Sequence, residues 1–226
     1  MKKDSLLIDW QENWRTEWQR LSFRYNLGLS LVILVGFLLL STRVLIYAES
    51  RSGMFFNDIL LSRLPSYDFS GLIFFLIYSS LIIGMSHVSR TPYRLVPAFY
   101  VYTIVLVCRM ISIYFFPLET PAGIIILRDP FVEYFTGSGK VVTKDLFFSG
   151  HTATMCIVYL FAKNKWLKMF FLTSTIAVGI LLLFQHAHYT MDVVAAPFFV
   201  YFCYVMVIKI YRKSRHFTLN ILSNGN

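Results

Sequence analysis

The stretch LGLSLVILVGFLLLSTRVLIY, residues 27–47, contains a single charged side chain, Arg43. A helix needs about 20 mostly apolar residues to cross a hydrocarbon core about 30 Å thick, and this stretch is long enough. Five further apolar runs follow: Gly71–His87, Leu95–Phe116, Leu146–Ala162, Leu167–Gln185 and Met191–Ile210. The runs that begin at Gly71 and at Leu146 are short, so we expect those two helices to tilt or to extend into their flanks.

The composition agrees with this pattern. The chain has 226 residues, of which 57% are hydrophobic, 18% aromatic and 15% charged. An ordinary soluble domain is about 45–50% apolar and about 25% charged. Disorder, a secreted disulfide scaffold and an ordinary cytosolic domain are therefore excluded. The sequence predicts an all-α integral membrane protein with six transmembrane helices.

The positive charge predicts the orientation. The net charge is +9, but the excess lies just outside the apolar runs, which argues against a nucleic-acid partner. Six basic residues flank one end of the predicted spans: Arg43, Arg51, Arg63, Arg128, Lys140 and Lys144. Fourteen flank the other end: Lys2, Lys3, Arg15, Arg20, Arg24, Arg90, Arg94, Lys163, Lys165, Lys168, Lys209, Arg212, Lys213 and Arg215. Since cytoplasmic loops carry the excess of Lys and Arg, both termini are predicted to be cytoplasmic.

The N-terminal segment has its own pattern. Its acidic residues and broken apolar pattern argue against a signal peptide. Apolar residues recur every three or four positions, at Leu7, Trp10, Trp14, Trp18 and Leu21. This spacing predicts an amphipathic helix on the cytoplasmic membrane surface, with a partner-binding helix as the alternative. We therefore divide the chain into this interfacial helix (1–25), a six-span membrane domain (26–212) and a basic cytoplasmic tail (213–226).

Two polar clusters interrupt the apolar pattern. The first is DLFFSGHT, residues 145–152, at the start of the fourth predicted span. The second is HAHYTMD, residues 186–192, between the fifth and sixth spans. Polar residues are costly at membrane depth and mark functional sites. In the predicted topology both clusters lie at the same, outer end of the protein.

The histidines of these clusters suggest nucleophilic chemistry. His188 and Asp192 are four residues apart, so on a helix they share one face. The carboxylate can then hold one imidazole nitrogen and leave the other as a nucleophile. His151 in the other cluster can protonate a leaving oxygen, since an imidazole exchanges protons near neutral pH.

Other polar residues suit a phosphate group. Ser149, Gly150 and the first amides of the fourth span present donors at a helix N-terminus. Arg109 lies near the outer end of the third span, where a guanidinium can hold phosphate oxygens in a fork. Two alternatives stay open: Arg109 pairs with a buried carboxylate or extends to the membrane surface, and a histidine–carboxylate set binds zinc. That set would be His151, His186, His188 and Asp192.

The motifs Ser149-Gly150-His151-Thr152 and His188-Tyr189-Thr190-Met191-Asp192 resemble those of sphingomyelin synthase-like proteins, within the phosphatidic acid phosphatase type 2 superfamily. The resemblance includes Asp145, His186 and the stretch 109–114, and it covers roughly residues 58–204. The chain lacks the Arg-Pro of the phosphatase branch and has Leu182 where that branch has an arginine, which favours the synthase-like branch. It also reads Thr143-Lys144-Asp145 where the animal synthases usually read Cys-Gly-Asp.

The resemblance implies a lipid phosphotransferase. Such an enzyme moves a phospho-head group from a glycerophospholipid to a lipid hydroxyl, of the ceramide or diacylglycerol class, through a phosphohistidine. His151, His188 and Asp192 would be catalytic, and no metal or other cofactor would be needed. Arg109, Asp145, Ser149, Gly150 and Tyr189 would bind phosphate or substrate.

Two other functions remain as alternatives. One is a lipid phosphatase or phospholipase C-type hydrolase that uses water as the acceptor. The other is a non-catalytic transporter or scaffold. The compact chain further suggests a bacterial inner-membrane protein whose site faces the periplasm, with a eukaryotic endomembrane protein as the alternative.

Overall fold

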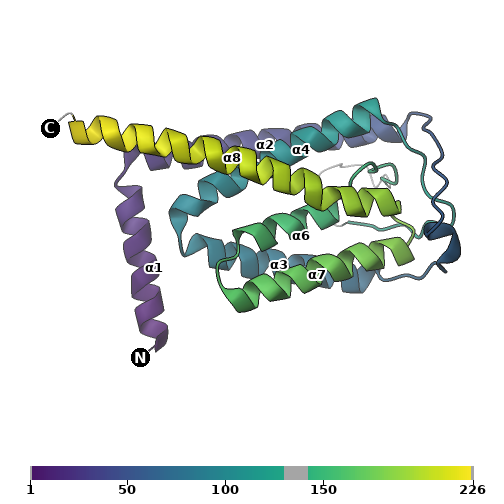
Figure 1. Cartoon of the computed structure of the whole chain (residues 1–226), viewed down its shortest axis with the longest axis horizontal. Coiled ribbons are helices and arrows are strands. Elements are labelled where there is room, and N and C mark those ends of the chain that lie inside the picture. The colour runs from purple at the N-terminus through teal and green to yellow at the C-terminus, as the bar shows by residue number, and fades with distance from the viewer. Residues whose placement is uncertain (1, 130–141, 225–226) are drawn as a thin grey trace.

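The computed structural model describes residues 2–129 and 142–224, and within those ranges the chain is helical, without strands (Figure 1). This confirms the predicted all-α fold. Two short 3-10 turns, η1 (Leu61–Arg63) and η2 (Pro92–Arg94), lie between the longer helices. The helices are α1 (Lys2–Trp18), α2 (Leu21–Glu49), α3 (Ser70–Ser89), α4 (Leu95–Phe115), α6 (Gly150–Phe161), α7 (Lys165–Phe184) and α8 (Thr190–Asn224).

The protein is a multi-pass integral membrane protein. In the described ranges, five helices are long and apolar enough to cross a membrane: α2, α3, α4 extended by η2, α7 and the part of α8 up to Ser214. The fourth predicted span is represented by α6, which has only 12 residues. At about 1.5 Å per residue it covers about 18 Å, well short of a bilayer core.

The shortness of α6 has a local cause. The predicted run began at Leu146, but Phe147 has a φ of 92°, in a region that side chains other than glycine rarely adopt. The chain therefore cannot be helical there, and the helix starts at Gly150, after Ser149 as its N-cap. As a result the first polar cluster lies on a loop and on the first turn of a short helix.

Helix α6 lies at the centre of the bundle and packs against α3, α4, α7 and α8. On one side, Met155 packs with Ile73 of α3 and Val178 of α7, and all three are fully buried. On its other side lie the buried valines of α4 and α8. Helix α2 packs mainly on α4 and leaves most of its surface to the membrane.

The terminal helices differ from the predicted boundaries. Helix α2 already begins at Leu21, so residues 21–25 continue the first span and do not belong to the N-terminal helix. Helix α1 lies across one end of the bundle (Figure 1), where the indole N–H groups of Trp10 and Trp14 donate to the carbonyl of Ser89 at 3.1 and 2.8 Å. Helix α8 runs through to Asn224, so the predicted tail continues it as far as the structure is described.

The two ends of the bundle carry different residues. The C-terminal ends of α2, α4 and α7 meet the N-terminal ends of α3, α6 and α8 at one end, which we call the site end (right in Figure 1). Both polar clusters lie there, as the predicted topology requires. The opposite end, which we call the basic end, carries α1 and the α3–α4 and α6–α7 turns. Lys140, counted in the orientation argument, lies outside the described residues.

Candidate active site

His188 and Asp192 form a buried pair at the start of α8. Nδ1 of His188 lies 3.4 Å from Oδ2 of Asp192, whose side chain is fully buried. His188 precedes the helix, so the carboxylate reaches back over the first turn, where Oδ2 also accepts from the Tyr189 amide at 3.1 Å. Oδ1 accepts from the Phe147 amide at 3.2 Å. These contacts fix the His188 ring and leave its Nε2 free of Asp192.

His151, the second residue of α6, faces His188. The two ring centroids are 6.3 Å apart and the planes are inclined by 65°. Both ring nitrogens of His151 are buried without a hydrogen-bond partner in the described part of the chain. The Nε2 atom lies 3.4 Å from Oδ2 of Asp129, whose Oδ1 accepts from the Tyr78 hydroxyl at 3.2 Å. The histidines of the two motifs therefore converge, each beside a carboxylate.

Arg109 of α4 forms an ion pair with Asp145 beside the two histidines. One of the alternatives left open by the sequence, a carboxylate partner for Arg109, is thus present. Burial raises the pKa of Asp145, but Arg109, with smaller contributions from His188 and His151, outweighs it and holds the pKa below its usual value. Nε of Arg109 is buried without a described hydrogen-bond partner, so the guanidinium retains donor capacity.

The N-terminus of α6 closes this arrangement. Oγ of the fully buried Ser149 accepts from the Thr152 amide at 3.3 Å and so caps the helix. The amides of Gly150 and His151 have no carbonyl within the helix to bond to. A Cβ atom on Gly150 would collide with the Arg109 guanidinium in its present position, so glycine leaves room for Arg109 against the helix start.

The loop that carries Asp145 is tied to α2. The Glu49 carboxylate accepts from the amides of Thr143 and Lys144 at 2.9 and 3.0 Å and from the Thr143 hydroxyl at 2.7 Å. The Lys144 ammonium donates to Glu119 at 3.0 Å. A hydrogen bond from the Gly53 amide, with a smaller contribution from Lys144, holds the pKa of Glu119 below its usual value.

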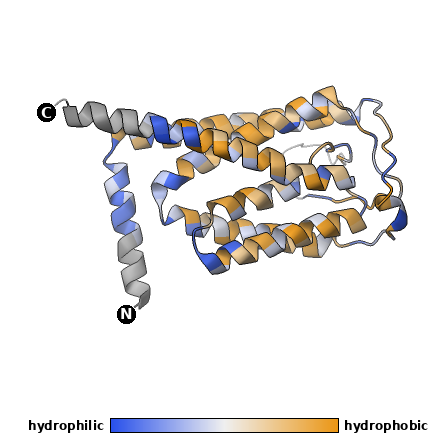
Figure 2. Cartoon of the chain, in the orientation of Figure 1, coloured by the Kyte–Doolittle hydropathy of each residue, from blue (hydrophilic) through white to orange (hydrophobic). Residues whose placement is uncertain are grey.

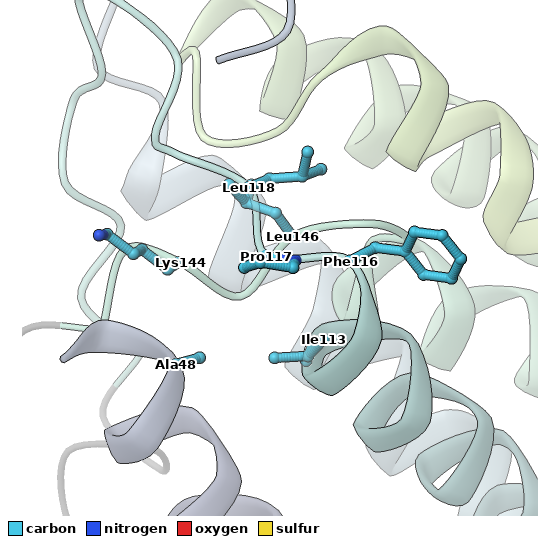
Figure 3. Close-up of a pocket in the computed structure, with 7 residues that line it drawn as sticks. All are labelled: Ala48, Ile113, Phe116, Pro117, Leu118, Lys144 and Leu146. Carbon is cyan, nitrogen blue, oxygen red and sulfur yellow. The ribbon is translucent and has the colours of Figure 1, made fainter. Parts of the chain in front are cut away.

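A small recess adjoins this loop on the side facing α2 and α4, with about 210 Å³ of empty space, part of it open to the outside (Figure 3). The side chains of its lining residues are apolar except for Lys144, and none of the predicted catalytic residues is among them. The recess is therefore a neighbour of the candidate site, not its centre. Its lining is Ala48, Ile113, Phe116, Pro117, Leu118, Lys144 and Leu146.

Two residues of the second cluster are engaged elsewhere. The His186 ring nitrogens lie 2.8 and 3.1 Å from the carbonyl oxygens of Ala122 and Leu64, so its side chain holds two loops together. Among the described residues, no group of three or more His, Cys, Asp or Glu side chains is placed to hold a metal ion.

The Tyr189 side chain is 1% exposed and its hydroxyl donates to the Glu119 carbonyl at 2.9 Å. This contact gives Tyr189 a packing role.

Besides Glu49, sequence reasoning missed the carboxylates of Asp129 and Asp58. Asp58 accepts from the Thr190 amide at 2.6 Å and from its hydroxyl at 3.0 Å, and so holds the first residue of α8. Burial raises the pKa of Asp58, but hydrogen bonds from Leu61 and Thr190 outweigh it and leave the pKa below its usual value. Both aspartates lie on loops far in sequence from their partners, and no local spacing marks them.

The fold and the converging histidines define a class: multi-pass membrane proteins with a polar site at one end of the bundle. Residues 144–210 match the family model described as PAP2 superfamily C-terminal, which spans Asp145, His151, His188 and Asp192. The match supports the PAP2 superfamily, whose members are phosphatases and phosphotransferases, without selecting the sphingomyelin synthase-like branch. A search of curated proteins found no match to the chain.

Proposed function

We propose that this protein is a lipid phosphotransferase that moves a phospho-head group from a glycerophospholipid to a lipid hydroxyl such as that of ceramide. One observation carries the proposal: two histidines from separate motifs face each other at 6.3 Å beside an arginine and a helix N-terminus. This set can supply a nucleophile, a proton donor and phosphate ligands without a metal.

In the first step, Nε2 of His188 attacks the donor phosphorus. The bond from phosphorus to the diacylglycerol oxygen breaks, and that oxygen takes a proton from His151. Asp192 keeps Nδ1 of His188 protonated and stabilises the positive charge on the ring as the P–N bond forms. Arg109 and the first amides of α6 stabilise the charge on the phosphoryl oxygens.

In the second step, the acceptor hydroxyl attacks the phosphohistidine. His151, now neutral, takes the hydroxyl proton, and the bond between phosphorus and Nε2 of His188 breaks. A bound phosphate would compete with Asp145 for Arg109. We therefore infer that the Asp145 carboxylate, once released from Arg109, binds the cationic amine of a zwitterionic head group. Asp129, whose Oδ2 lies 3.4 Å from Nε2 of His151, helps to orient this ring in both steps.

The second candidate function is hydrolysis, with water as the acceptor. The family match favours it to the extent that the superfamily includes phosphatases. The same residues would act, and only the acceptor would differ. For either reaction we place the site end outside the cytoplasm, in keeping with the charge bias, and in a bacterial cell this would be the periplasmic face.

The experiment is a lipid assay on purified wild type, His188→Ala and His87→Ala. His87 lies near the basic end of α3 and serves as the matched histidine control. A donor labelled in its phospho-head group is supplied with and without ceramide, and the products are separated by mass. We expect a phosphosphingolipid only when ceramide is present, with wild type and His87→Ala but not with His188→Ala.

The other results are equally informative. A free phospho-head group formed without any acceptor dependence, and lost in His188→Ala, would establish the hydrolase. Full turnover by His188→Ala would overturn both reactions. A label that stays on wild-type protein after an alkaline quench and is released by acid would identify the phosphohistidine directly.

A further inference from the structure

The basic end has an unusual composition. All four tryptophans of the chain lie there, Trp10, Trp14 and Trp18 on α1 and Trp166 at the start of α7. Figure 2 shows hydrophilic segments in α1 and in the α3–α4 and α6–α7 turns, next to the apolar helices. Tryptophan collects at membrane–water interfaces, so this end lies at the head-group level of one leaflet.

The α6–α7 turn is the most basic of these segments. Lys163, Lys165 and Lys168 lie within six residues, all three are exposed, and no Asp or Glu occurs between Leu146 and Met191. The Asn164 side chain accepts from the amides of Trp166 and Leu167 at 2.9 and 3.2 Å and so fixes the turn. The Lys163 amide donates to His87 at 3.2 Å, which ties the turn to α3.

Trp166 joins this charge to the membrane-facing surface of α7. Its side chain is 84% exposed, and at helical spacing it continues the exposed face formed by Met169, Ile176 and Ile180. Since α7 is one of the spanning helices, this face lies against lipid chains. The tryptophan therefore ends a lipid-facing stripe where the lysines begin.

We propose that the α6–α7 turn binds the head groups of anionic phospholipids in the leaflet at the basic end. The lysines supply positive charge that no carboxylate of the same segment neutralises. Trp166 lies at the depth of the lipid ester and phosphate groups. This site is separate from the candidate active site, lies at the opposite end of the bundle and does not depend on the proposed reaction.

A lipid is the occupant that these observations favour. A soluble polyanion would also meet the lysines, but it would leave Trp166 and the exposed stripe of α7 without a partner. A phospholipid meets both, with its phosphate at the lysines and its chains along α7. Each lysine near an anionic surface contributes about a fivefold factor in affinity at low salt.

The test is a titration of the purified full chain in detergent with phosphatidylglycerol and with phosphatidylcholine of the same acyl chains, followed by native mass spectrometry. We expect wild type to bind phosphatidylglycerol at least tenfold more tightly. The variant Lys165→Gln/Lys168→Gln should lose most of this preference, and Trp166→Ala should weaken both lipids. The preference should also fall as salt is added, because exposed charges are screened.

The matched control is Arg43→Gln/Arg63→Gln, which removes two exposed cations at the site end. It should keep the preference of wild type. Lipid bound in the candidate active site would be insensitive to the lysine changes, so the two sites are distinguished. Equal binding of the two lipids by wild type, an equal loss in the control, or displacement of the lipid by inorganic phosphate at a similar concentration would each overturn the proposal.

Discussion

The two ends of the bundle treat charge in opposite ways. At the site end, two partly buried cations have carboxylate partners: Arg109 pairs with Asp145 and Lys144 pairs with Glu119. At the basic end, the lysines of the α6–α7 turn are exposed, and the ammonium groups of Lys163 and Lys168 lie over the rings of Tyr93 and Tyr159. Buried charges are costly unless they are paired and hydrogen-bonded, so the site end depends on exact geometry while the basic end tolerates change. Substitutions at the site end should therefore have larger effects than substitutions at the basic end.

The largest effect is expected for Asp192→Asn. The amide cannot accept from both the Tyr189 and Phe147 amides and still hold a protonated Nδ1 of His188, so the imidazole loses its orientation. Turnover of the proposed reaction should fall by about 10³-fold or more, as for other base–orienter pairs. The measurement is kcat for the labelled donor, and the control is Asp68→Asn, an exposed carboxylate at the start of α3. A loss of less than tenfold would show that Asp192 does not support the nucleophile.

The next effect is steric, at Gly150→Ala. The added methyl group would displace the Arg109 guanidinium from the start of α6. We expect kcat/KM to fall by about 100-fold, in the range found when a donor to the developing charge is lost. Gly71→Ala, in the first turn of α3, is the matched control, because a Cβ there meets nothing within 4 Å. If the two variants are equally active, Arg109 has no part in the reaction.

The contrast between the ends also explains what the sequence could predict. The apolar runs placed α3, α4 and α7 within a few residues, because membrane insertion depends on local composition, whereas α2 begins earlier and α8 ends later than predicted. The two motifs, which are short and contiguous, likewise predicted a site around His151, His188 and Asp192, and the structure brings these three residues together. The irregular start of α6 was not predicted, because the positive φ of Phe147 depends on packing against Phe116 and on the bond to Asp192.

The partners of the site depend on long-range contacts. The Asp129 carboxylate contacts His151 from another segment of the chain. The Glu49 carboxylate accepts from the Thr143 amide, and these two residues are 94 positions apart in the sequence. Neither carboxylate has a sequence spacing that distinguishes it from an ordinary loop or helix-end residue. Likewise, Asp145 carries no local sign that its partner is Arg109 and not His151. Sequence spacing finds residues that act within one segment, and it misses those that position another segment.

A smaller effect is expected for Glu49→Ala, which removes the anchor of the loop but no proposed catalytic group. The two amides of residues 143 and 144 lose their acceptor, at a cost of about 1–3 kcal/mol each if they stay buried. We expect kcat to fall about tenfold with little change in KM, as Asp145 and Arg109 lose their fixed position. Thr143→Val removes only the hydroxyl contact, so its kcat should fall less than threefold. Equal losses in the two variants would assign the anchoring to the hydroxyl alone.

The smallest effect is a pH dependence of stability at Asp58. Its pKa is lower in the folded protein than the usual 3.8, so the unfolded chain binds the extra proton. The stabilisation is therefore present above about pH 4 and is lost as the pH falls through the folded pKa. Thermal unfolding in detergent between pH 6 and pH 3 should show a steeper loss for wild type than for Asp58→Asn. The same comparison with Lys165→Gln should show no difference from wild type, because that charge has no buried partner to lose. Parallel curves for wild type and Asp58→Asn would mean that the bonds to Thr190 do not depend on the carboxylate charge, and that the start of α8 is held by packing alone.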